Sequence, residues 1–112
     1  MREMYEMLDE LGVCHPECWS EYGPGWHALI RGTLERMLAA GWDGRLGQIK
    51  EKFGGLRIYI DTGNDAVWKI IDEAEALSFK TCEFCGRPGR RRSGGWIKVR
   101  CDECEAAREG KA

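Results

Sequence analysis

Two Cys-x-x-Cys pairs near the end of the chain are the residues whose type and spacing most clearly indicate chemistry. Cys82 and Cys85 form the first pair, and Cys101 and Cys104 form the second, with fifteen residues between the pairs. This spacing is typical of a structural zinc site, in which two tight turns each point two thiolates at one ion. Four thiolates complete a tetrahedron, so we expect one structural Zn²⁺ that has no open position for catalysis.

A strongly basic segment lies between the two cysteine pairs. Residues 80–100 carry seven basic side chains and one acidic side chain, a net charge of +6, whereas the 112-residue chain carries −2. This segment predicts contact with a nucleic acid or a protein partner, and a solvated loop that balances the acidic N-terminal helix is the alternative. If residues 96–100 form a strand, an aromatic ring and two cations share one face. The candidate partner-binding residues are Arg90, Arg91, Arg92, Trp96, Lys98 and Arg100.

The elements that must position these residues follow from apolar periodicity. Helices are predicted over residues 2–11, from residue 24 or 25 to 40, and over residues 64–78. In the last of these, we expect an inward-facing stripe of Val67, Ile70, Ile71, Ala74 and Leu77. The fold class is therefore α+β, with two or three helices packed on a small antiparallel hairpin and a C-terminal treble-clef or zinc-ribbon finger. We expect residues 1–79 to form the core and residues 80–112 the finger, together one compact unit.

The predicted hairpin centres on Gly54 and Gly55. Pairing outward from this two-residue turn places Phe53 opposite Leu56. One face is then apolar, except for Glu51, which lies at a rim, pairs with a buried base or amide, or indicates a shifted register. The apolar face contains Ile49, Phe53, Leu56, Ile58 and Ile60. The other face carries an alternative ligand site, suited to binding or degrading a nucleotide-like anion, formed by Lys50, Lys52, Arg57 and Tyr59.

Other sequence features bear on chemistry less directly. Cys14, His15 and Cys18 could form a second metal site, and free thiols on a loop are the alternative. Residues 80–112 lack histidine, which excludes a His-Asn-His nuclease finger. A zinc deaminase is disfavoured because Thr81, and not proline, precedes the first cysteine pair. We therefore expect a noncatalytic binding module.

The composition also indicates a compartment. The acidic start MREMYEMLDELG lacks the basic, apolar and small-residue order of a secretory signal, and the longest apolar runs are only a few residues. We therefore expect a cytoplasmic protein without a membrane segment. In a reducing cytoplasm, the six cysteines are better explained as metal ligands or free thiols than as disulfides.

One stretch resembles a known group of proteins. The run QIKEKFGGLRIYID, preceded by GWHALI and followed by TCEFCGRPG and CDEC, resembles short uncharacterised zinc-binding proteins of phages and bacteria. The resemblance covers about residues 24–105 and implies a phage or prophage setting. The finger is also similar to that of RNA-polymerase regulators of the DksA/TraR type, which begins with Cys-x-x-Cys-Gly. This chain lacks their long coiled coil, so we do not extend their mechanism to it.

Overall fold

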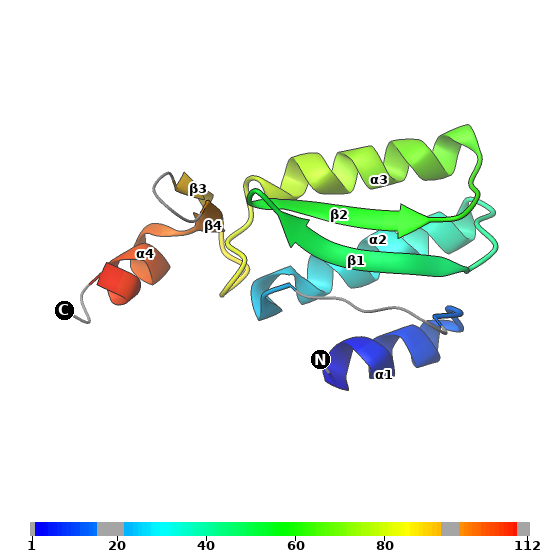
Figure 1. Cartoon of the computed structure of the whole chain (residues 1–112), viewed down its shortest axis with the longest axis horizontal. Coiled ribbons are helices and arrows are strands. Elements are labelled where there is room, and N and C mark those ends of the chain that lie inside the picture. Colours follow the sequence, from blue (N-terminus) through cyan, green and yellow to red (C-terminus); the bar gives the residue numbers. More distant parts are fainter. Residues whose placement is uncertain (1, 16–21, 93–96, 110–112) are drawn as a thin grey trace.

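Helices and two short hairpins alternate along the chain. The structure, a computed structural model, describes residues 2–15, 22–92 and 97–109 (Figure 1). In chain order, the elements are α1 (Arg2–Leu11), a 3₁₀ turn (Pro24–Trp26), α2 (His27–Ala39), β1 (Leu46–Lys52), β2 (Gly55–Ile60), α3 (Asp65–Ser78), β3 (Arg90–Arg92), β4 (Lys98–Arg100) and α4 (Asp102–Glu109). The α+β class is confirmed. The described residues form four α-helices and not two or three, because α4 belongs to the finger and adds to the three core helices.

The core lies between the β1–β2 hairpin and the helices. Helix α3 packs against both β2 and α2, and α1 contacts α2. Local signals fix the helix ends: the Asn64 side chain accepts a hydrogen bond from the Val67 amide (2.9 Å) at the start of α3, and Gly41 takes a φ of 101° after α2. The buried apolar side chains include Met4, Leu8, Trp26, Ile30, Leu34, Met37, Ile49, Leu56, Ile58, Val67 and Ala74.

The buried stripe of α3 differs from the prediction at one residue. Leu77 is half exposed and not inward, whereas Ser78 is fully buried. The Ser78 hydroxyl accepts a hydrogen bond from the Leu56 amide of β2 (2.9 Å) and donates one to the Glu75 carbonyl. The spacing of four residues from Ala74 to Ser78 continues the stripe, so Leu77 lies about 100° to its side. The apolar pattern did not predict that a buried polar residue would accept a hydrogen bond from a backbone amide of β2.

The hairpin turn also differs from the prediction. Lys52 pairs with Gly55 and Glu51 pairs with Leu56, so the turn residues are Phe53 and Gly54. Both have positive φ, 53° and 87°, as a type I′ turn requires. The predicted pairing of Phe53 with Leu56 is therefore wrong, and Phe53 is 63% exposed instead of lying on the apolar face.

Tertiary packing explains the position of the turn. A Cβ atom on Gly55 would lie 2.6 Å from the ring of Phe79, so only glycine fits in β2 at this point. Gly54 is then left to occupy the turn. Moving a two-residue turn by one residue shifts each partner by two, which keeps the side chains of the paired strands on their predicted faces, although Phe53 moves into the turn. Ile49 and Ile58 are accordingly buried together.

The finger lies at one end of the molecule, beyond the hairpin turn (Figure 1). It begins with the turn that carries Cys82 and Cys85, continues through the antiparallel pair β3–β4, and ends with α4. The predicted strand is confirmed for Lys98–Arg100, and Trp96 lies outside the described residues. In the described part of the chain, no helix has the length and apolar character needed to cross a membrane.

Candidate metal centre

The four finger cysteines meet at one point. The Sγ atoms of Cys82, Cys85, Cys101 and Cys104 all lie within 4.8 Å of one another, and the Cys85 and Cys101 sulfurs are 3.5 Å apart. In a tetrahedral site with metal–sulfur bonds of about 2.3 Å, sulfurs are separated by about 3.8 Å. The observed spacing fits one metal ion, so the cluster could hold a metal.

Local structure brings the two pairs into position. After the first pair, Gly86 takes a φ of 83°, and its amide donates a hydrogen bond to the Cys82 carbonyl (2.9 Å). Cys101 immediately precedes α4, and Cys104 lies in the first turn of that helix. The Cys104 amide donates to the Cys101 sulfur (3.4 Å). A tight turn and a helix start therefore each present two sulfurs.

The surroundings of the four sulfurs lower the pKa of one thiol and raise that of another. Burial acts to raise the pKa of Cys82, but backbone hydrogen bonds from Cys101, Cys85 and Phe84 outweigh it and lower the pKa to about 7. A hydrogen bond with the Cys101 side chain raises the pKa of Cys104 to about 12. Cys82 therefore ionises before Cys104, and a cation that binds the cluster must displace the Cys104 proton.

The first cysteine pair is joined to the start of α2. The Gly25 amide donates a hydrogen bond to the Glu83 carbonyl (2.7 Å), and the indole Nε1 of Trp26 donates to the Thr81 carbonyl (2.9 Å). A Cβ atom on Gly25 would lie 2.3 Å from the Cys82 carbonyl oxygen, so this contact requires glycine. The Gly-Pro-Gly-Trp segment thus holds the finger against the core.

A buried ion network forms a second junction between finger and core. Lys98 Nζ lies 2.9 Å from Glu51 Oε1 and 3.5 Å from Glu83 Oε1. Glu51 Oε2 also accepts a hydrogen bond from the Gly54 amide (2.7 Å), and Glu83 Oε2 accepts one from the Gly23 amide (2.9 Å). Burial raises the pKa of Glu83, and the neighbouring Lys98 opposes this rise. Glu51 therefore lies on the apolar face because it pairs with a buried base and an amide.

The basic segment divides into internal and exposed members. Three cations make contacts within the finger or the core: Arg92 donates to the Arg100 carbonyl and pairs with Asp102, Arg100 lies over the Phe84 ring, and Lys98 joins the network above. Arg90 and Arg91 are exposed. Sequence reasoning did not anticipate the role of Glu83, although its position as the single acid in a basic segment was a usable signal.

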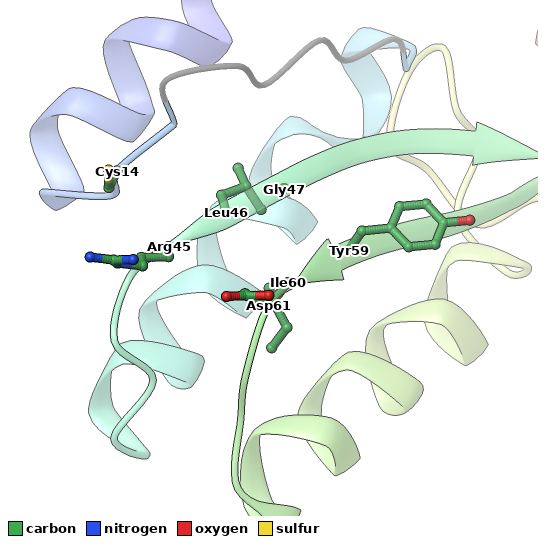
Figure 2. Close-up of a pocket in the computed structure, with 7 residues that line it drawn as sticks. All are labelled: Cys14, Arg45, Leu46, Gly47, Tyr59, Ile60 and Asp61. Carbon is green, nitrogen blue, oxygen red and sulfur yellow. The ribbon is translucent and has the colours of Figure 1, made fainter.

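The four hairpin residues predicted as a ligand site lie on the face turned away from the core. Lys50 pairs with Arg57 across the strands, and Lys52 and Tyr59 occupy the same face. Of these four, only Tyr59 lines a pocket of about 680 Å³ at the far end of the hairpin. Figure 2 shows Arg45 and Asp61 beside that end and the Tyr59 ring directed along the hairpin. Nothing in the sequence singled out Arg45.

The upstream cysteine and histidine do not join a metal cluster among the described residues. Cys14 is exposed, and His15 Nε2 lies 2.9 Å from Asp9 Oδ1. Cys18 lies outside the described residues. The four finger cysteines are the one group of three or more close donors in the described part of the chain.

The fold and the site define a small α+β protein whose four-cysteine finger could hold a metal ion and is docked on a helix–hairpin core. No protein-family model matches the chain, and comparisons with curated proteins and with solved structures gave no significant match.

Proposed function

We propose that this chain is a noncatalytic zinc-binding module that presents a basic surface of the finger to a nucleic acid. The observation that carries the proposal is the cluster of four sulfurs at the base of the β3–β4 hairpin, on which Arg90 and Arg91 are exposed. The order of turn, hairpin and helix supports a treble clef. A cytoplasmic setting in a phage or prophage context is part of the proposal, because a reducing compartment keeps cysteines as thiols that can bind a metal.

Zinc is the proposed ion because all four donors are sulfur. A single ion in a tetrahedral, all-thiolate site is typical of Zn²⁺, and the completed coordination sphere leaves no place for a reacting water. The ion would fix the finger, whose described residues bury few apolar side chains of their own. Binding energy of the metal would then become folding energy of the finger.

A nucleic-acid partner is favoured by the charges that remain on the surface. Arg90 and Arg91 follow one another on β3, and neither forms an ion pair with a carboxylate in the described part of the chain. Arginine forks fit phosphate oxygens, and because successive strand residues project to opposite faces, Arg90 and Arg91 can contact phosphates on the two sides of β3. The acidic side chains of the finger, by contrast, pair with Arg87, Arg92, Lys98 and Arg100.

The proposal is tested by metal analysis and binding on the same preparation. Native mass spectrometry of the full chain is expected to show one zinc per chain. Fluorescence anisotropy with a labelled single-stranded oligonucleotide is expected to show binding that weakens with salt. Substituting alanine for Arg90 and Arg91 together should flatten the salt slope by about 1.4, that is, two single-strand phosphate contacts.

The matched control is Arg87→Ala, because Arg87 is an exposed finger arginine that already pairs with Glu103. It is expected to retain the salt slope of the wild type. An iron-loaded protein would contradict the metal assignment. Binding that ignores salt, or retention of a host protein in place of nucleic acid, would contradict the partner assignment.

A second candidate function is the binding of a nucleotide-like ligand at the far end of the hairpin. The observation that favours it is the pocket of about 680 Å³, whose lining includes the cationic Arg45 and the aromatic Tyr59. An anion there should raise the melting temperature of the protein. Arg45→Ala should abolish that rise, whereas alanine at Arg90 and Arg91 should leave it unchanged.

A further inference from the structure

The tip of the β1–β2 hairpin carries an aromatic residue that the turn does not favour. Phe53 has a φ of 53°, the single positive value among non-glycine residues in the described ranges, and its side chain is 63% exposed. Type I′ turns favour asparagine or glycine at this position, because a bulky side chain is strained there. The ring gains little from burial. Strain kept without a packing benefit points to a functional role.

Phe53 belongs to a series of three cation–aromatic pairs. Lys52 Nζ lies 5.9 Å from the centre of the Phe53 ring, and Lys50 Nζ lies 5.9 Å from that of Tyr59. In the finger, the Arg91 guanidinium lies 5.2 Å from the centre of the Phe79 ring. Each pair offers a positive charge beside an aromatic ring.

These pairs occupy one continuous surface. Lys52 lies directly opposite Gly55, so both residues project to the outward face of the hairpin. The Phe79 ring covers that face at Gly55, because a Cβ atom there would lie 2.6 Å from the ring. Arg91 lies on Phe79, and its Cγ would be 3.6 Å from a Cβ atom on Gly54. The finger and the hairpin therefore meet at the tip.

The charge of this surface is largely uncompensated. Glu51 projects to the opposite face, where it pairs with Lys98. Glu75 lies 3.7 Å from Arg57 and is the one carboxylate paired with a cation of the outward face among the described residues. Lys50 and Lys52 remain available for phosphates. The two basic sets that the sequence offered as alternatives thus form one surface.

We infer that this surface binds single-stranded nucleic acid, with phosphates at Lys50, Lys52 and Arg91 and an unpaired base stacked on Phe53. The inference rests on the proposed function and extends it from the finger to the hairpin. Exposed aromatic rings between cations are the means by which proteins bind single strands without sequence preference. In a duplex the bases are already stacked on one another, so a protruding ring has no free base face to contact.

The test compares stability and binding in one variant. Phe53→Asn places the favoured Asn-Gly pair in the turn, so the melting temperature should stay the same or rise. The same variant should lose about 5- to 150-fold in affinity for a labelled single strand of about 16 nucleotides, the loss expected when one base loses its stacking partner. Oligouridine and oligothymidine probes separate RNA from DNA. A duplex of equal length should bind more weakly than either.

Trp68→Ala is the matched control. Trp68 is an exposed aromatic residue near the start of α3, whereas the proposed surface lies near the end of that helix, at Phe79. Its affinity for the single strand should equal that of the wild type. If Phe53→Asn binds as tightly as the wild type while alanine at Arg90 and Arg91 still weakens binding, the hairpin surface is excluded and the proposed function stands. If the wild type binds neither single strand, both proposals fail.

Discussion

The core and the finger of this protein are held together by different forces. The core buries a continuous apolar cluster contributed by α1, α2, the β1–β2 hairpin and α3. In the described finger residues, by contrast, the buried side chains are Cys82, Glu83, Val99 and Cys101. The hydrophobic contribution to stability grows with the apolar area that is buried, so it is large in the core. A single buried valine contributes too little to stabilise the finger. Polar contacts join the finger to the core, and we propose that a metal ion held by the four cysteines supplies its remaining stability.

The junction between the two regions therefore decides whether the chain acts as one unit. It includes the hydrogen bond from the Gly25 backbone amide, the hydrogen bond from the Trp26 indole and the ion network centred on Lys98. Buried ionic contacts contribute little net stability, but they are costly to break and they fix one arrangement.

Metal removal should affect the finger most. A strong chelator, or Cys82→Ser, removes a binding free energy on the order of 10 kcal/mol, which is the range for structural zinc. Amide hydrogen exchange should then lose protection in residues 80–109 and retain it in the apolar core. Cys14→Ser is the control, because Cys14 is exposed and outside the cluster. Equal loss of protection in both regions would refute the distinction between them.

Lys98→Met should be the most disruptive single change at the junction. It leaves Glu51 and Glu83 buried without their shared cation, at a cost of about 3–5 kcal/mol. Urea unfolding of the zinc-bound protein measures this loss. Lys80→Met provides an exposed lysine for comparison and should change stability little. A Lys98 variant as stable as the wild type would show that the network does not fix the junction.

Gly25→Ala should loosen the finger through sterics alone. The added methyl group would overlap the Cys82 carbonyl, and overpacking of this kind costs about 1–3 kcal/mol. The control is Gly32→Ala in α2, where a Cβ atom meets nothing within 4 Å. That variant should gain about 0.5–1 kcal/mol from helix propensity. Thermal unfolding should move the two melting temperatures in opposite directions, and a common direction would contradict the packing argument.

Asn64→Ala should weaken the core and leave the metal site unchanged. It removes the cap of α3, a loss of about 1 kcal/mol. It also removes the hydrogen bond from the Asn64 amide to the Ala40 carbonyl. Zinc affinity, measured by competition with a chelator, should equal that of the wild type. A weaker zinc affinity would mean that the core and the finger are more strongly coupled than their contacts indicate.

Helix positions were predictable because they depend on neighbouring residues. The predicted range 2–11 matches α1, and the range 64–78 differs from α3 by one residue. Apolar spacing and capping residues act within one or two helical turns, so both can be read directly from the chain. Leu77 was misplaced because the same pattern ignores polar residues, and Ser78 was buried for its hydroxyl group.

Contacts distant in sequence were not predictable. The position of the hairpin turn depends on Phe79, which reaches Gly55 from beyond the end of α3. The pairing of Glu51 with Lys98 spans 47 residues, and that of Gly23 with Glu83 spans 60. The sequence offered three explanations for Glu51 and a surface role for Lys98. Only their distance in the fold shows that the two residues pair with each other.

The sequence by itself determined the type of each element, the four clustered cysteines and the face of the residues in the paired hairpin strands, because spacing along the chain sets direction locally. The tertiary structure decided which charges face the solvent and which are paired inside. It also placed Arg91 of the finger beside the hairpin tip. The physical reason is that a side chain's charge state and exposure depend on what packs against it, and those neighbours come from distant parts of the chain.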